Sequence, residues 1–509
     1  MDKQAYKKLV RSLETDAVVS PGGFRNKVLV LSAAFHAVLG GALCAALLLA
    51  GFGIAYAGFG RGGLGLLLAA LLALALAPAC FAVLRLCLAR LPAPAGRPLT
   101  RAEVPRLFSA LSNIRKQLDG PEIDHVLLDV HFSVALVQRA RWGLFGRPVN
   151  YLVMGLPYMQ SMAPKEMLAA IAHEVELVVG RRDRAGAWAH RQQRMAAALL
   201  AQLREARHEN LLDNVAARLL DKFMPYYQAH ALVLGRQNAF DADRGGSAVV
   251  GAKANAACLL RGALLRRWID TDFWPNLQRQ ANTQEQPLYL PYTAMRAAFK
   301  ASYAQWATAE RLAAAWHERP GLSDPQPPLS ARVEAIGEIM ELPPGIKISA
   351  AEALLGERAK GLIDEFDQQW WKQEQRRWLA RHRYVSGSRS RLEQLQRVLP
   401  AKLKLDELQE LAMLCAEFEP PARAKRLHEY LLDLPGGPFA RAEYDYGCLL
   451  LAERNENGLE HLATAARADR ELTALAARVG YKYLKHTRDE QEALEWWNGV
   501  SRKAYTPDH

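Results

Sequence analysis

The residues best suited to chemistry form the run Ala172-His173-Glu174-Val175-Glu176-Leu177. A helix with the pattern His-Glu-x-x-His places two histidines one turn apart. Both imidazoles can then bind a zinc ion, and the glutamate can activate a metal-bound water. Here the first histidine and the glutamate are present, but Leu177 stands at the position of the second histidine. The motif predicts zinc chemistry only if other side chains complete the ligand set.

A catalytic zinc ion needs three protein ligands and an open position for water. Glu176 lies three residues after His173, so the two side chains share a helix face and could hold a metal together. Three further residues could donate a nitrogen or an oxygen: Asp241, His190 and His208. The alternative is that Glu176 is a surface residue beside nearby arginines, and that His173 and Glu174 are hydrogen-bonded remnants of a former cleft.

Several runs around the motif occur in a fixed order. They are Asn150-Tyr151-Leu152-Val153-Met154-Gly155-Leu156-Pro157, Met162-Ala163-Pro164-Lys165-Glu166 and Ala169-Ala170-Ile171-Ala172-His173-Glu174, followed by 186–188, 241–244, 273–275 and 324–332. In this order, over about residues 120 to 340, they resemble the membrane zinc metallopeptidases of the HtpX and CAAX prenyl protease family. The resemblance implies a gluzincin-like domain, mainly α-helical with a small β-sheet (α+β), next to a membrane.

The resemblance also implies the roles of individual residues. His173 matches the first zinc ligand and Glu174 the catalytic glutamate, whereas Leu177 replaces the second ligand. In the family the third ligand is a glutamate four residues before the aspartate of an E-x-x-A-D motif. Asp243 matches that aspartate, but Ala239 stands in place of the glutamate.

Other family positions are partly changed. The Asn-Ala pair of the edge strand, which holds substrate, corresponds to Ser133 and Val134. A later His-Pro pair that helps to stabilise the oxyanion corresponds to Gln326 and Pro327, while Arg332 is retained six residues further on. The site residues implied by the resemblance are therefore mostly lost, and the surrounding packing residues are kept.

Without its other ligands, one histidine would hold zinc too weakly, and Glu174 would have no acidified water to deprotonate. The sequence therefore predicts a zinc-free pseudopeptidase that binds or regulates proteins or peptides at a membrane, with no cofactor. One alternative is an active zinc metalloendopeptidase with rebuilt ligands, acting in membrane protein quality control. Another is that the C-terminal repeats alone carry the function and the peptidase-like part is a spacer.

Two apolar runs, 28–56 and 64–84, each exceed the roughly 20 residues that a helix needs to cross a bilayer. They predict a transmembrane hairpin within 28–90, preceded by a cytoplasmic segment 1–27. Basic residues gather before the first run and after the second, with only Arg61 between them. The positive-inside rule then predicts that both ends of the chain lie in the cytoplasm. The family resemblance implies a bacterial protein of the cytoplasmic (inner) membrane. The alternative is a pair of buried helices in a soluble core.

The rest of the chain divides into three predicted regions: a metallopeptidase-like domain at 100–340, a helical connector at 341–388 and a tetratricopeptide-like region at 389–509. In the first region we expect a helix at 101–118, strands at 125–137 and 149–156, and a helix that starts at Pro164. Ser386-Gly387-Ser388 is predicted to be a linker. Arg454 and Arg488 are 34 residues apart, the period of tetratricopeptide repeats. An ordinary helical bundle without a peptide groove is the alternative.

The formal net charge of +12 suits a domain beside an anionic membrane leaflet. Nucleic-acid binding would also explain this charge, but no basic run is interleaved with aromatic residues, so we predict no nucleic-acid partner. The 6 cysteines form no CxxC pair, which is typical of reduced thiols in a protein that faces the cytosol.

Overall fold

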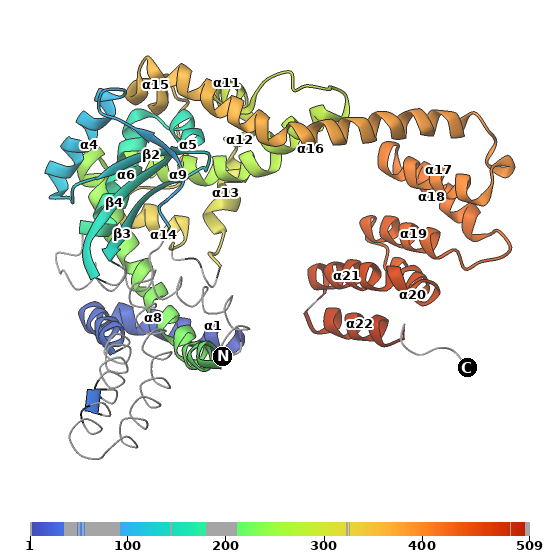
Figure 1. Cartoon of the computed structure of the whole chain (residues 1–509), viewed down its shortest axis with the longest axis horizontal. Coiled ribbons are helices and arrows are strands. Elements are labelled where there is room, and N and C mark those ends of the chain that lie inside the picture. Colours follow the sequence, from blue (N-terminus) through green and yellow to red (C-terminus); the bar gives the residue numbers. More distant parts are fainter. Residues whose placement is uncertain are drawn as a thin grey trace. The chain divides into compact units, whose positions relative to one another are not determined.

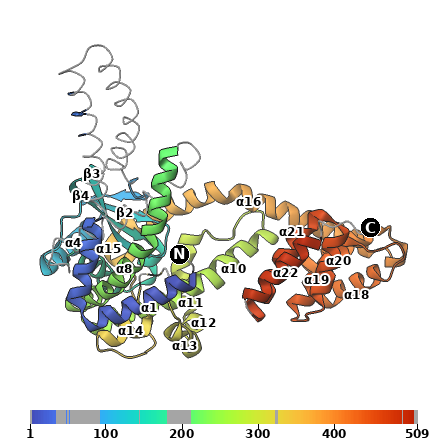
Figure 2. The same cartoon turned by 90° about the horizontal axis from the view of Figure 1, so that it is seen from below.

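The computed structural model describes residues 3–34, 48, 51–52, 55, 92–142, 145–179, 211–321, 324, 326–488 and 490–503. The chain forms two compact units, shown in Figures 1 and 2. The first unit comprises Met1–Leu277 and Tyr289–Gln373, and the second comprises Gln278–Leu288 and Glu374–His509. The first holds a small mixed sheet among helices, and the described elements of the second are helices. The prediction of a mainly helical protein with a small sheet is confirmed.

The sheet contains β1 (Arg97–Leu99), β2 (His125–Asp129), β3 (Val134–Trp142) and β4 (Phe145–Gly155), in the order β1-β2-β4-β3. Strands β2 and β4 are parallel, and the other neighbours are antiparallel. The expected single strand at 125–137 is wrong, because it is divided into β2 and β3. The Asp129 carboxylate accepts a hydrogen bond from the His131 N–H at 3.1 Å, a local turn that ends β2.

One face of the sheet forms the core of the first unit. The parallel register pairs Val126 with Leu152 and Leu128 with Met154, so the apolar residues at every second position lie on the same face. All four side chains are buried. Two helices share this core: α4 (Pro105–Leu118) and α6 (Pro164–Val179). Figure 1 shows both beside the sheet.

Helix α6, which carries His173 and Glu174, begins at Pro164 as expected. Its first turn is fixed by Glu166, whose carboxylate accepts a hydrogen bond from the Ala163 N–H at 2.8 Å. Buried apolar residues then recur along one side of the helix, at Met167, Ile171 and Val175. This periodicity fixes the rotation of α6 against the sheet.

The other side of α6 packs against α8 (Leu211–Val250). Two consecutive glycines of α8 permit a close approach. A Cβ atom at Gly245 would lie 2.6 Å from the Glu176 side chain, and one at Gly246 would lie 3.3 Å from the Ala169 carbonyl oxygen. The absence of a side chain at these two positions allows α8 to lie directly against the motif helix.

The other described helices of this unit support these elements. They are α1 (Lys3–Val19), a helix at 21–34, α5 (Leu156–Ser161), α9 (Ala252–Trp268), a π-helix (Ile269–Phe273), α10 (Trp274–Arg279), α11 (Pro291–Ala301), α12 (Tyr303–Trp306), α13 (Ala309–His317), α14 (Leu329–Ala335) and α15 (Ala350–Leu355). Helix α1 and the following helix bury Leu13, Phe24 and Val28 against Leu232 and Val233 of α8. The N-terminal segment is therefore packed against this unit.

The predicted membrane hairpin falls mainly on 35–91, where only residues 48, 51, 52 and 55 are described. Within the described parts of the chain, none of the helices combines the length and the apolar character needed to cross a bilayer. The start of the first apolar run is helical, and Ser32 shares a hydrogen bond of 2.7 Å with Tyr227. The hairpin and its cytoplasmic orientation stay predictions.

Helix α16 (Arg358–Gln396) runs from the first unit into the second without a break. The predicted linker at Ser386-Gly387-Ser388 is wrong, because these residues lie inside α16. Serine and glycine are weak helix formers, but apolar contacts close by outweigh that preference. Leu392 and Leu395 of α16 are buried in a core that they share with the next helix.

Six helices follow, ordered as three consecutive pairs. They are α17 (Leu405–Phe418), α18 (Pro421–Leu432), α19 (Ala440–Ala452), α20 (Gly458–Ala468), α21 (Arg470–Thr487) and α22 (Glu490–Lys503), and each packs on the next. Arg454 follows the end of α19 and Arg488 follows the end of α21, so the 34-residue spacing connects equivalent helix ends. The helical hairpins agree with a repeat region, and its capacity to bind peptides stays a prediction.

Candidate functional site

Three side chains that lie far apart in the sequence meet where α6, α8 and α14 come together. The Asp243 carboxylate of α8 accepts a hydrogen bond from His173 Nδ1 at 2.8 Å. It also accepts two from the Arg332 guanidinium, at 2.7 and 2.8 Å. The carboxylate can only accept, so Nδ1 carries the proton in this pair.

Burial makes these contacts strong. Asp243 is 0 % exposed, and the Arg332 side chain is 14 % exposed. Burial by itself disfavours the charged carboxylate, but the hydrogen bonds from Arg332 and His173 outweigh it and lower the pKa of Asp243. Asp243 is therefore an ionised carboxylate that fixes the imidazole of His173 and the guanidinium of Arg332.

The second imidazole nitrogen of His173 has no such partner. Nε2 is buried, and no hydrogen-bonding group of the described residues reaches it. When a carboxylate orients one imidazole nitrogen, the other nitrogen can serve as a metal ligand, as is common in zinc sites. The two positions that would complete the site are occupied by Leu177, half-buried on α6, and Ala239, buried on α8. Neither side chain has an atom that can bind a metal ion.

Glu174, the other motif residue, is held by the sheet. Its carboxylate accepts a hydrogen bond from the Leu136 N–H at 3.1 Å. Leu136 lies in β3, which is an edge strand of the sheet, so this amide points away from β4. Glu174 therefore occupies a hydrogen-bonding position at the open edge of the sheet, where an added strand would bind.

A second buried ion pair lies between α6 and α9. Arg261 is 1 % exposed and donates to the Glu166 carboxylate at 2.9 and 3.1 Å. Nearby, the Tyr158 hydroxyl and the Cys258 thiol lie 3.2 Å apart, and burial raises the pKa of Cys258 to about 12. We did not predict these residues from the sequence. One signal was available, because Arg261 is the only charged residue in an otherwise apolar run from 256 to 265.

The structure places the other predicted residues outside the His173 cluster. The Glu176 side chain lies against the backbone of α8 at Gly245, and Asp241 is an exposed residue that pairs with Arg244. Gln326 is held by a backbone hydrogen bond to the Asp324 carboxylate at 2.9 Å. Two further predicted residues lie at the start of β3: Ser133, whose carbonyl accepts from Gly155 N–H at 2.8 Å, and Val134, which pairs with Met154.

The donors that the structure describes do not fit a three-ligand zinc site. His173 Nε2 could supply one bond, but nowhere among the described residues do three His, Cys, Asp or Glu side chains come close enough to hold a metal ion. His190 and His208, the other candidate donors, lie outside the described residues. A zinc-free site remains a prediction.

Comparison with known proteins gives no relative on which to base an assignment. None of the protein-family models, curated proteins or solved structures matches this chain. The resemblance to the membrane zinc metallopeptidases therefore rests on the residues of the chain itself.

Proposed function

We propose that this protein is a membrane-anchored pseudopeptidase of the HtpX and CAAX prenyl protease type, which binds polypeptides without cutting them. The observation that supports this most is that two of the three expected ligand positions have no donor, while each motif side chain is held by one hydrogen bond to the protein. His173 Nδ1 is bonded to Asp243, and Glu174 is bonded to the Leu136 amide, at 2.8 and 3.1 Å. Leu177 and Ala239 meanwhile offer no metal donor.

The edge of β3 is the surface on which a polypeptide would bind. An extended chain can add to an exposed edge strand through backbone hydrogen bonds, with little demand on its sequence. Amides alternate in direction along an antiparallel strand, so the N–H of Val134, which pairs with Met154, points to the same open edge as that of Leu136. The Leu136 N–H is bonded to Glu174, so the outward N–H of Val134 would hold the added strand.

The first test compares metal content and cleavage. The purified full chain is expected to contain no stoichiometric zinc and to leave casein uncut, with or without a chelator. Zinc at one equivalent, together with chelator-sensitive cleavage that Glu174→Gln abolishes, would instead establish the active metalloendopeptidase.

The second test measures binding at the sheet edge with fluorescein-labelled, unfolded casein. Val134→Pro removes one outward N–H and no hydrogen bond to β4, so casein binding should fall about tenfold. Val134→Ala is the matched control, because it shortens the same side chain but keeps the amide. Equal binding by both variants would place the polypeptide elsewhere.

The third test rebuilds the ligand set. Leu177→His together with Ala239→Glu should produce a protein that binds zinc, because His173 is already oriented by Asp243. Each single variant serves as a control with an incomplete ligand set. If the double variant folds but takes up no zinc, then the alignment of Ala239 with the family's third ligand is wrong.

A further inference from the structure

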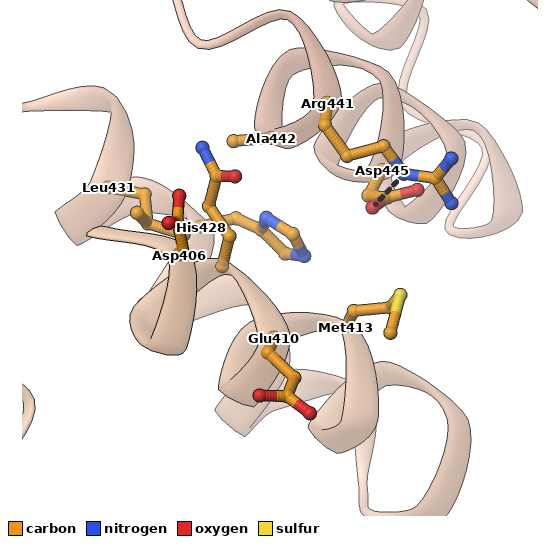
Figure 3. Close-up of a pocket in the computed structure, with 9 residues that line it drawn as sticks. Asp406, Glu410, Met413, His428, Leu431, Arg441, Ala442 and Asp445 are labelled. Carbon is orange, nitrogen blue, oxygen red and sulfur yellow. Dashed lines mark hydrogen bonds and ion pairs between the residues drawn. The ribbon is translucent and has the colours of Figure 1, made fainter. Parts of the chain in front are cut away.

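A pocket of about 210 Å³ lies within the second unit, between α17, α18 and α19 (Figure 3). It is bounded by residues of all three helices. Engineered cavities of about 150 Å³ already admit a molecule as large as benzene, so this pocket has room for a long side chain. Asp406, Met413 and Arg441 are exposed, so they form a rim that is open to solvent.

The base of the pocket is formed by His428 of α18, which is 1 % exposed. Figure 3 shows its ring pointing into the space between the helices. Neither Nδ1 nor Nε2 has a hydrogen-bonding partner among the described residues. Burial lowers the pKa of His428 to about 4, so the ring is neutral at pH 7 and carries one donor and one acceptor. Buried polar atoms of this kind are usually satisfied, which indicates that a polar group of a ligand belongs here.

The charges of the residues that line the pocket indicate whether the ligand is an anion or a cation. Asp406, Glu410 and Asp445 contribute carboxylates, and Arg441 contributes the single guanidinium. Arg441 is paired with Asp445 at 3.0 Å, and Glu410 is paired with Arg391 outside the lining at 2.9 Å. In the described part of the chain the Asp406 carboxylate has no ion-pair partner. The pocket therefore has an excess of negative charge.

The remaining wall is apolar and is formed by Met413, Leu431 and Ala442. A wall of this kind suits the methylene chain of lysine or arginine, which packs on apolar surface while its charged end reaches polar groups. A metal ion suits the pocket less well, because no three His, Cys, Asp or Glu side chains of the described residues are grouped closely enough to coordinate one. The chemistry on all sides fits a long cationic side chain.

We propose that this pocket binds one lysine or arginine side chain of a polypeptide partner. The methylene chain of the lysine or arginine would lie on Met413 and Leu431. The cationic group would pair with Asp406 and donate a hydrogen bond to the unprotonated ring nitrogen of His428. The proposal concerns the second unit alone, so it does not depend on whether the peptidase-like site is active. It adds a defined point of recognition to the proposed binding function.

The test uses fluorescence anisotropy with the purified full chain. The probes are fluorescein-labelled, C-terminally amidated peptides Gly-Gly-X-Gly-Gly, in which X is lysine, arginine, norleucine or acetyl-lysine. The lysine and arginine peptides are expected to bind at least about tenfold more tightly than the two neutral peptides, because a hydrogen bond to a charged group is strong. The fluorescein label is an anion on all four peptides, so the norleucine peptide also measures any non-specific attraction to the net charge of +12.

Variants locate the binding. Asp406→Asn removes the unpaired carboxylate, and His428→Leu removes both bare nitrogens while filling the same space. Each should weaken binding of the lysine peptide about tenfold. Asp433→Asn is the matched control, because Asp433 is an exposed residue at the end of α18 that does not line the pocket. It should leave the affinity unchanged.

Three results would overturn the proposal. The first is equal binding of the lysine and norleucine peptides, or no binding of any peptide. The second is unchanged affinity for the lysine peptide in both pocket variants. The third is binding of free cadaverine as tight as that of the lysine peptide, which would assign the pocket to small amines instead of a polypeptide.

Discussion

At the scale of single residues, the buried Asp243 carboxylate joins the imidazole of His173 and the guanidinium of Arg332. Replacing it with Asn leaves the Arg332 guanidinium buried without an opposite charge. We expect Asp243→Asn to lower the free energy of unfolding of the first unit by about 3–5 kcal/mol, the usual cost of breaking a buried ion pair. Denaturant unfolding of the full chain measures this loss.

Asp241→Asn is the control for that prediction. Asp241 lies two residues away on the same helix, but its pair with Arg244 is exposed to solvent. The control should cost less than about 1 kcal/mol, because exposed pairs contribute little. Similar losses for both variants would show that the buried pair is not the source.

The same carboxylate predicts a pH dependence. Hydrogen bonds hold the folded-state pKa of Asp243 below the ordinary value of 3.8. Its contribution to stability is therefore present above about pH 4 and is lost as the pH falls through the folded-state pKa. The unfolding free energies of the native protein and of Asp243→Asn should converge in acid, and a constant difference between them would contradict this.

The burial of His428 predicts that the stability of the second unit also depends on pH, in a higher pH range than for Asp243. Its folded-state pKa of about 4 lies below the ordinary 6.5, so protonation favours the unfolded chain. Stability should be complete above pH 6.5 and fall by about 2 kcal/mol by pH 5. Denaturant unfolding at the two pH values measures this change. In His428→Leu the unfolding free energy should no longer fall by this amount between the two pH values. If it falls as much as in the native protein, then another group causes the pH dependence.

At the scale of elements, sequence patterns predicted the parts that depend on neighbouring residues. The start of α6 at Pro164 and its buried stripe follow from local spacing, so they could be predicted. The division of 125–137 into two strands occurs at a turn where the Asp129 carboxylate is hydrogen-bonded to the backbone and the ring of His131, which periodicity does not reveal. The continuity of α16 through Gly387 depends on packing against other helices, which overrides local composition.

The candidate site shows the same limit. The family resemblance identified His173, Asp243 and Arg332 as single positions, but it did not show that one carboxylate joins the other two. Those contacts cross 70 and 89 residues of chain and arise only when α6, α8 and α14 pack together. The Glu166 and Arg261 pair crosses 95 residues and was missed for the same reason.

Two glycine substitutions in helices of the second unit are predicted to have opposite effects on its stability. A Cβ atom at Gly480 would lie 2.1 Å from the Trp496 ring, whereas one at Gly387 would meet nothing within 4 Å. Gly480→Ala should therefore destabilise the second unit by about 1–2 kcal/mol, despite the better helix propensity of alanine. Denaturant unfolding of the full chain measures both variants.

Gly387→Ala is the matched control, also inside a helix of the second unit. With open space around it, it should stabilise that unit by about 0.5–1 kcal/mol. Effects of the same sign would show that contact with Trp496 does not control the outcome at Gly480.

At the scale of the whole molecule, the two proposed binding sites lie in different units of the chain. The His173 cluster lies in the first unit, and the His428 pocket lies in the second. Because each unit has its own hydrophobic core, the substitutions above are expected to act on separate unfolding transitions. The proposed polypeptide-binding edge and the proposed pocket for a basic side chain can therefore be altered independently.

The contacts of the N-terminal segment constrain how the chain can meet a membrane. Phe24, before the predicted hairpin, and Val28, the first residue of its first apolar run, pack on Leu232 and Val233 of α8, which follows the hairpin. Ser32, also in that run, shares a hydrogen bond with Tyr227 of α8. If the predicted hairpin crosses a bilayer, contacts of this kind require the N-terminal helices and α8 to lie on the same side of it.

This arrangement predicts the outcome of reporter fusions. A phosphatase that is active only outside the cytoplasm should be active when inserted after Gly60, between the two apolar runs, and inactive when fused after His509. The reason is that basic residues flank the two apolar runs, with Arg61 alone between the runs, and the positive-inside rule then predicts that both ends lie in the cytoplasm. Activity after His509 would reverse the orientation. Inactivity at both positions, with both fusions present at normal levels, would show that the apolar runs do not cross the membrane.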